Sequence, residues 1–242
     1  KMDASLWIAK TGLTAQQTRM SVISNNLANV NTTGFKKDRA VFEDLLYQNI
    51  VPAGGQVDAE SETPTGLMLG TGTRVVATEK LHAQGNIITT ENALDLAISG
   101  DGYFSVQQAD GTIAYTRDGG FKLSAEGSLV TAGGQAILPA VVVPQNAASL
   151  TIGRDGIVTV ELANGGGSSQ IGQLQLSRFV NNSGLQPIGR NLMQQTNASG
   201  DPIVVIPGAD GAGMLMQGAL EASNVNVVEE MVNMIETQRA YE

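Results

Sequence analysis

The sequence contains few of the residue types from which catalytic, metal and nucleic-acid sites are built. It has no cysteine, which excludes disulfides and thiolate metal sites, and its only histidine is His82. Charged residues make up 15% of the 242 positions, against about a quarter in an average protein, and the formal net charge is -9. The one local basic run, residues 36–39 (KKDR), is interpreted as a solvated turn. We therefore expect no nucleic-acid partner.

Long hydrophobic runs are missing as well. No apolar run approaches the roughly 20 residues of a membrane-spanning helix, so we expect no membrane insertion. The N-terminal residues lack the charged, then apolar, then small-residue pattern of a cleavable signal peptide. If the protein leaves the cytoplasm, we expect an export route that does not read such a signal. The length is enough for one large domain or two modest ones with a buried core.

Motifs that carry catalysis or ligand binding are also absent from the sequence. No Ser-His-Asp arrangement can be assigned around His82, and Gly-x-Ser-x-Gly does not occur. The Asp-Gly pairs are typical of hairpin turns, and none has the flanking ligands of a calcium loop. The glycine-rich stretches at 70–74 and 208–213 follow no buried strand and open no helix, as a phosphate site requires. The sequence predicts a protein that is not an enzyme, with no catalytic residues, no cofactor and no metal.

Apolar residues recur with a helical period at both ends of the chain. A heptad stripe in the first segment, residues 3–30, comprises Leu6, Leu13, Met20, Ile23, Leu27 and Val30. A stripe in the last segment comprises Val228, Met231 and Ile235. That segment opens on Asn226 and Glu229, which fit a capping box, and its pattern runs to Glu242 without a terminating Gly or Pro. We expect either fraying there or a longer natural chain.

The period changes to two in the middle of the chain. From about residue 73, glycine turns are followed by apolar residues two apart, such as Phe104 and Val106, which predicts antiparallel strands. Residues 46–72 have little periodicity and are too many for an ordinary connection. They fit an extended hairpin, a binding loop or a disordered linker.

The predicted fold class is α+β, with long N- and C-terminal helices, paired as in a coiled coil, flanking a β-rich, mostly antiparallel middle. The predicted division is an N-terminal helix in 1–35, a connector in 36–72, a β-rich domain in 73–221 and a C-terminal helix in 222–242. A single pair of helices with such narrow apolar stripes is only marginally stable in water. Many copies packed side by side would bury every stripe. Packing that does not close into a ring yields a helical filament. The layout therefore predicts a self-assembling structural subunit with helices inside and the β domain outside.

Three parts of the chain resemble one protein family. Residues 6–48 ("LWIAKTGLTAQQTRMSVISNNLANVNTTGFKKDRAVFEDLLYQ") are similar to the N-terminal signature of bacterial flagellar basal-body rod and hook proteins. "ISGDGYFSV" and "YTRDGGFKL" resemble the central β region of that family, and "EASNVNVVEEMVNMIETQRAYE" resembles its C-terminal signature. Within the family, residues 46–72 and "VFEDLLYQ" are most similar to distal-rod members. A proximal rod or hook subunit stays an alternative, as does a β-rich adhesin or glycan-binding domain from another class.

The resemblance implies a role in the flagellum. Such a subunit self-assembles helically into the distal rod, a rigid hollow drive shaft that transmits torque across the periplasm and rotates inside a ring bushing. The implied partners are further copies of itself, other rod and hook proteins, the periplasmic and outer-membrane ring bushing, and the flagellar type III export apparatus. The implied location is the basal body in the periplasm, reached without a cleaved signal peptide. The segment at about 46–65 is associated with the straight distal rod, and Phe42 and Leu46 resemble an export motif.

An asparagine cluster ends the first helical segment, in "NNLANVNTTGFK". Asparagine is a poor residue for a helix interior because its amide competes for backbone hydrogen bonds. Asn25, Asn26 and Asn29 flank the apolar stripe, where amides can bond to neighbouring subunits and set the register of packing. We predict that these three residues form a subunit joint.

Overall fold

The structure is a computed structural model that describes residues 2–51, 56–58, 61–62, 67–163 and 165–242. The chain divides into two compact units. Unit 1 comprises Lys1–Ala28, Asp38–Lys80 and Asn226–Glu242, and unit 2 comprises Asn29–Lys37 and Leu81–Val225. The chain therefore passes from one unit to the other four times.

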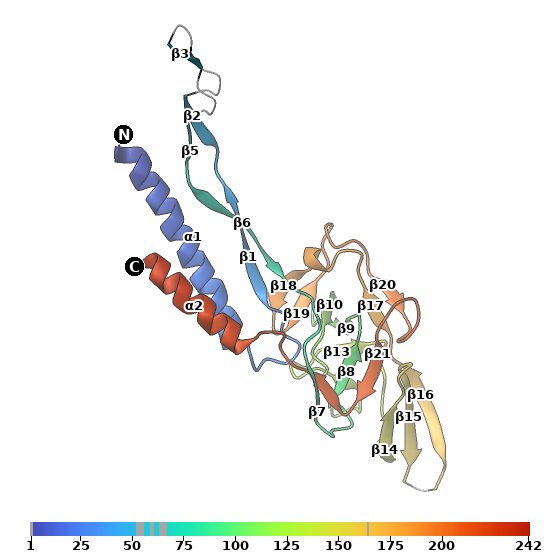
Figure 1. Ribbon diagram of the computed structural model, residues 1–242. Helices are drawn as coiled ribbons and strands as arrows, with labels where there is room; N and C mark the ends of the chain where they lie inside the picture. The colour runs from blue at the N-terminus through green and yellow to red at the C-terminus, as the bar shows by residue number, and fades with distance from the viewer. Residues whose placement is uncertain (1, 52–55, 59–60, 63–66, 164) are drawn as a thin grey trace. The chain divides into compact units, whose positions relative to one another are not determined.

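Unit 1 combines two helices with a long antiparallel β-ribbon (Figure 1). Its elements are α1 (Met2–Ala28), β1 (Asp38–Asp44), β2 (Tyr47–Val51), β3 (Gln56–Asp58), β4 (Ser61–Glu62), β5 (Leu67–Gly70), β6 (Thr73–Lys80) and α2 (Val227–Tyr241). The strands pair antiparallel as β1–β6, β2–β5 and β3–β4. The ribbon approaches α1 at Gly72, which has a φ of +118° and would place a Cβ 2.2 Å from Thr11 Oγ1. Glycine is required there for both reasons.

The first turn of α2 carries the signals that start a helix. The side chain of Asn226 accepts hydrogen bonds from Val228 N at 3.0 Å and from Glu229 N at 3.3 Å. These bonds satisfy two of the amides that the first turn leaves without an intrahelical partner. Glu229 and Glu230 lie in the first turn and Arg239 in the last, which complements the helix dipole.

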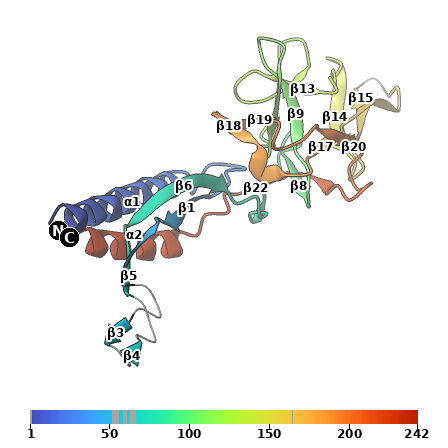
Figure 2. The same cartoon turned by 90° about the horizontal axis from the view of Figure 1, so that it is seen from above.

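The two helices lie side by side and antiparallel, with the ends marked N and C on the same side in both views (Figures 1 and 2). Their buried residues are small or polar for the most part, namely Ala15, Ile23 and Asn26 on α1 and Glu230 and Thr237 on α2. Leu6 and Leu13 of the predicted heptad stripe are 67% and 45% exposed. The predicted fold class is therefore wrong in its helical part. A long coiled-coil pair does not form, because α2 has 15 residues and its predicted stripe residues Val228, Met231 and Ile235 are exposed rather than packed against α1.

Unit 2 is built from antiparallel strands. Its elements are β7 (Ile87–Thr89), β8 (Leu96–Ser99), β9 (Phe104–Gln107), β10 (Ile113–Thr116), β11 (Lys122–Leu123), β12 (Leu129–Val130), β13 (Ala136–Leu138), β14 (Ala147–Ile152), β15 (Ile157–Leu162), β16 (Ser168–Gln173), β17 (Leu176–Arg178), the 3₁₀ helix η1 (Asn182–Gly184), β18 (Gln186–Gly189), β19 (Leu192–Gln194), β20 (Ile203–Val205), β21 (Met214–Gln217) and β22 (Ala219–Glu221). One sheet has seven strands in the order β11-β12-β13-β9-β10-β19-β18, and a second has the order β14-β15-β16. Two-stranded pairs join β17 to β20, β8 to β21 and β7 to β22.

The apolar core of the chain lies in unit 2. Strand β9 alternates as a half-buried strand should, with Phe104 and Val106 fully buried and Ser105 between them half-buried. The largest cluster comprises Leu96, Ile98, Phe104, Phe121, Leu129, Ile137, Val141, Ile152, Val158, Leu174, Leu176, Val205 and Leu215. The rings of Phe104 and Phe121 pack edge to face with centroids 5.0 Å apart. Burying each such side chain contributes about 1.5–3 kcal/mol, so this cluster organises the unit.

Candidate assembly interface

The exposed faces of α1 and α2 carry large apolar side chains. On α1 they are Leu6, Trp7, Ile8 and Leu13, and on α2 they are Val227, Val228, Met231, Val232, Ile235 and Tyr241. The positions 228, 231, 232 and 235 follow the spacing of one helix face, so they form a continuous stripe. Contiguous exposed apolar surface of this kind marks a protein-protein interaction site. We call these residues the apolar stripes.

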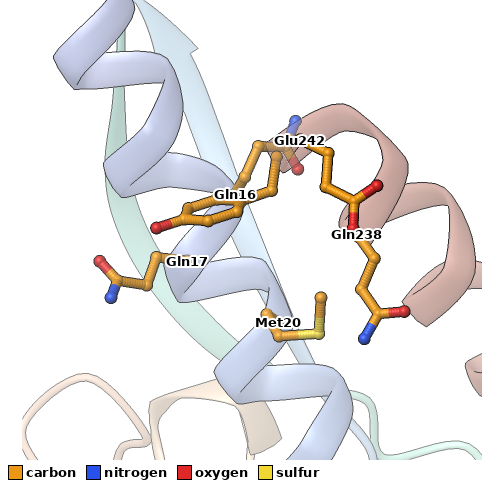
Figure 3. A pocket seen from close by; sticks show the side chains of 6 residues that line it. Gln16, Gln17, Met20, Gln238 and Glu242 are labelled. Carbon is orange, nitrogen blue, oxygen red and sulfur yellow. The ribbon is translucent and has the colours of Figure 1, made fainter.

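A groove of about 400 Å³ lies between the two helices. It is lined by Gln16, Gln17, Met20, Gln238, Tyr241 and Glu242. Figure 3 shows Gln16 and Met20 on the side of α1 that faces Gln238 and Glu242, whereas Gln17 points away from them. The side-chain oxygen of Gln16 is buried and has no hydrogen-bond partner among the residues that the structure describes. The wall of the groove therefore contains one buried acceptor whose hydrogen bond is unmade.

The predicted subunit joint is divided between different surroundings. Asn26 is buried, and its Nδ2 donates to Asp38 O at 2.9 Å and to Glu230 Oε2 at 3.2 Å, while its Oδ1 accepts from Asp38 N at 2.8 Å. Asn25 is exposed and donates to Asp38 Oδ2 at 3.2 Å. Asn29 lies beyond the end of α1, in unit 2, and its Oδ1 accepts from the Thr32 hydroxyl at 3.1 Å. Their role in joining subunits stays a prediction.

The other predicted assembly residues also differ in exposure. Ile23 is buried, Met20 and Leu27 are half-buried, and Val228, Met231 and Ile235 are exposed. Val30 follows α1 rather than belonging to it. The structure thus brings Ile23 into the helix pair and leaves most of the predicted stripe at the surface.

The β-ribbon of unit 1 is exposed and carries charge pairs along its edges. Arg39 bonds to Glu79, and Arg74 bonds to Glu43, across the β1–β6 pair. The predicted export residue Leu46, between β1 and β2, is 87% exposed, and its companion Phe42 is also exposed. Of the predicted distal-rod segment at about 46–65, residues 52–55, 59–60 and 63–65 lie outside the described residues. The export motif stays a prediction.

A buried charge cluster in unit 2 was not foreseen from the sequence. Lys36 Nζ donates to Glu221 Oε1 at 2.6 Å, and Arg117 Nε donates to Glu221 Oε2 at 2.8 Å. Lys36 and Glu221 are 3% and 1% exposed, so the interpretation of residues 36–39 as a solvated turn is wrong for Lys36. Gly34, two residues before Lys36, lies so close to Arg117 that a Cβ at Gly34 would be 2.7 Å from the Arg117 backbone. This close approach places the Lys36 segment inside unit 2. No sequence motif pairs residues so far apart.

Electrostatics keep Glu221 ionised in this cluster. Burial alone would raise the pKa of Glu221, but the guanidinium of Arg117 and the ammonium of Lys36 outweigh it and lower that pKa below its ordinary value. Gly85 N adds a hydrogen bond to the same carboxylate at 2.9 Å. Both carboxylate oxygens are therefore paired. A buried ion cluster satisfied in this way is costly to break by removing one member.

The single histidine has a structural partner. His82 Nδ1 lies 2.8 Å from the Tyr103 hydroxyl, and the two rings pack edge to face with centroids 6.1 Å apart. Burial raises the pKa of Tyr103, which keeps the phenol protonated. In the described part of the chain, no three acidic or histidine side chains gather as metal ligands, and no helix is apolar and long enough to cross a bilayer.

Comparison with known families and proteins gives consistent matches along the chain. Residues 6–36 match the family described as flagella basal body rod protein, residues 97–160 match the flagellar hook protein FlgE/F/G D1 domain, and residues 216–242 match the flagellar basal body rod FlgEFG protein C-terminal family. The flagellar basal-body rod protein FlgG of Buchnera aphidicola subsp. Schizaphis graminum is 56% identical over 241 residues, which cover all of this chain and 93% of that protein.

One bacterium supplies two relatives for comparison. The flagellar basal-body rod protein FlgG of Caulobacter vibrioides is 44% identical, with 98% of this chain and 91% of that protein covered. The flagellar basal-body rod protein FlgF of the same organism is 34% identical, with 100% of this chain and 90% of that protein covered. The similarity is thus higher to the first of these two rod proteins.

Proposed function

Because the chain belongs to the FlgG family of flagellar basal-body rod proteins, we propose that its copies pack through the apolar stripes of α1 and α2 into the distal rod. The family resemblance expected from the sequence is thereby confirmed, and the chain is a structural subunit of the flagellar basal body. Membership in this family sets aside the adhesin alternative. The higher identity to FlgG than to FlgF in one organism favours the distal rod over another rod subunit.

The observation that carries the proposal is the apolar stripe on α2. Val228, the most exposed of its members, has 70% of its surface open to solvent, and Met231 and Ile235 are about half open. Burying one such side chain fully contributes about 1.5–3 kcal/mol, so several of them can hold a neighbour firmly. A second copy is the occupant we infer, because the chain belongs to a family of rod proteins and both of its helices leave these apolar residues uncovered.

The groove between the helices supports the same proposal. A buried carbonyl oxygen without a partner costs about 1–3 kcal/mol, and Gln16 Oε1 is such an atom. A hydrogen-bond donor on a neighbouring copy would remove that cost only if the copy packed in the one register that brings the donor to Gln16. We infer that the groove selects the register in which copies pack, while the apolar stripes supply most of the affinity.

The finer assignments follow from the family resemblance. We propose that residues 1–35 and 222–242 line the inner tube, that 73–221 form the outer domain, and that 36–72 connect them. The proposed partners are other copies, other rod and hook proteins, the ring bushing and the type III export apparatus, with the assembled rod in the periplasm. The subunit acts by packing and load bearing, and needs no catalytic residue, cofactor or metal.

The test places charge on the apolar stripe of α2. Purified Val228→Asp/Met231→Asp protein should remain monomeric under conditions in which the parent forms polymers visible by electron microscopy and sedimentation. The cause is the cost of burying two carboxylates in an apolar contact. Val142→Asp, at an exposed apolar position of unit 2, is the matched control and should polymerise as the parent does. Polymers of the double variant like those of the parent would contradict the proposal.

A further inference from the structure

Three of the four chain crossings between the units meet at one side chain in unit 2. The crossings lie at 28/29, 37/38, 80/81 and 225/226. The Oδ1 of Asn224 accepts from Lys37 N at 2.7 Å, and its Nδ2 donates to Leu81 O at 2.8 Å and to Ala83 O at 2.9 Å. Lys37 and Leu81 are the last and first residues of unit 2 at two crossings, and Asn224 is adjacent to Val225 at a third. One carboxamide thus joins all three segments.

Glu221 joins the same three segments a second time. Its carboxylate accepts from Lys36 at 2.6 Å and from Gly85 N at 2.9 Å, and its backbone oxygen accepts from Gly34 N at 2.8 Å. Arg117 connects this carboxylate to the strands of unit 2. Segments 34–37, 81–85 and 221–224 therefore form one hydrogen-bonded block.

Asn26 has the corresponding position in unit 1. Its carboxamide bonds to both backbone groups of Asp38, the first residue of unit 1 after the 37/38 crossing, and to Glu230 of α2. Lys80, the last residue of unit 1 before the 80/81 crossing, donates to Asp38 Oδ1 at 2.8 Å. Each unit therefore holds its crossing segments with one asparagine, assisted by charged neighbours.

When torque acts on a short linker, the linker ordinarily twists by rotation about φ and ψ, which are the only soft dihedrals of the backbone. Several linkers whose ends are bonded together in each unit can rotate only if those bonds break. We propose that Asn224 in unit 2 and Asn26 in unit 1 are positioning residues that hold the crossing segments, so that torque passes between the assembly helices and the β-rich unit. That the protein carries torque rests on the proposed function. That the two units are coupled rests on the hydrogen bonds alone.

The test measures coupling in the dilute monomer. Because the chain has no cysteine, Thr78→Cys in unit 1 and Gln194→Cys in unit 2, both exposed, would carry the only two spin labels. Asn224→Ala should broaden the distribution of distances between the labels. It should also speed hydrogen exchange of the Lys37 amide by roughly fivefold to tenfold, the effect of losing one hydrogen bond. Exchange at Val158, in the core of unit 2, should not change.

Two further variants keep the test decisive. Asn224→Asp retains the acceptor for Lys37 N and loses both donors, so the Lys37 amide should stay protected while the distance distribution broadens. Asn181→Ala removes an amide that donates to Ala198 O at 3.0 Å away from the crossings, and should change neither measurement. An unchanged distribution in Asn224→Ala, or equal broadening in Asn181→Ala, would overturn the proposal. Failure of the parent protein to polymerise would count against the proposed function and leave this result standing.

Discussion

The two units differ in which of their apolar and charged side chains are buried. Unit 2 buries many of its large apolar residues in one principal cluster, although others such as Val180 are exposed, and it also buries an ion cluster at Glu221. Unit 1 buries Ala15, Asn26 and Thr237 between and around its helices, and leaves Trp7 and Met231 exposed. Its pairs Arg39–Glu79 and Arg74–Glu43 are at the surface, whereas Lys80–Asp38 is half-buried. We conclude that unit 2 is organised to be stable alone, whereas unit 1 is organised to become complete on packing with neighbours.

The largest effect should separate the stability of the units from their assembly. Phe104→Ala removes a fully buried ring from the core of unit 2 and should lower the free energy of unfolding by about 3–5 kcal/mol. Leu13→Ala truncates an exposed side chain of unit 1 and should change it by less than about 0.5 kcal/mol. Chemical denaturation of the monomer measures both values. Sedimentation should then show weaker polymerisation for Leu13→Ala. Equal destabilisation by the two substitutions would contradict the contrast between the buried core of unit 2 and the exposed helix face of unit 1.

The next effect concerns the buried ion cluster of unit 2. Glu221→Gln leaves Lys36 and Arg117 buried without a counter-charge, and should destabilise the protein by about 3–5 kcal/mol at neutral pH. Denaturation followed by a spectroscopic signal from unit 2 measures the change. Glu161→Gln, an exposed position of β15 whose carboxylate accepts from Ser149 Oγ at 3.0 Å, is the control and should have little effect.

The same variant predicts a pH dependence. The pKa of Glu221 is lower in the folded chain than its ordinary value of 4.5, so its ionised form stabilises the fold above about that pH. This stabilisation is lost as the pH falls through the lowered value. The difference between parent and Glu221→Gln should therefore shrink below pH 4.5. A difference that stayed constant down to strong acid would show that the carboxylate charge has no such role.

The smallest effect should come from the surface pairs of unit 1. Arg74→Ala removes the exposed partner of Glu43 on the β1–β6 ribbon and should cost about 0–1 kcal/mol. The cost should fall further in concentrated salt, which screens exposed charges. Thermal unfolding in low and high salt measures both. A loss comparable to that of Glu221→Gln would remove the distinction between surface and buried charges.

Local features of the fold could be predicted from sequence because they depend on neighbouring residues. Asn226 caps α2 as expected, since its side chain reaches amides two and three positions ahead. The turn at Asp110 forms because its carboxylate accepts from Thr112 N at 2.9 Å, and bonds to Thr112 lower the pKa of that acid. The period of two in β9 placed Phe104 and Val106 on one face. The family was also identifiable, because its signatures extend along the chain.

The sequence by itself determined a helix near each end of the chain, the β-rich middle and the membership in the rod family, but it did not predict the strands β1, β2 and β5 of the connector. The tertiary structure alone decided which faces are covered. A heptad stripe indicates that a helix has an apolar side, but burial depends on which element packs against that side. In this protein the buried residues of α1 and α2 are mostly small or polar. Lys36 lies 185 positions from Glu221, and Asn26 lies 204 positions from Glu230, so no local pattern could have paired them. Only folding brings those charges and amides together, because a buried polar group is stable only beside its partner.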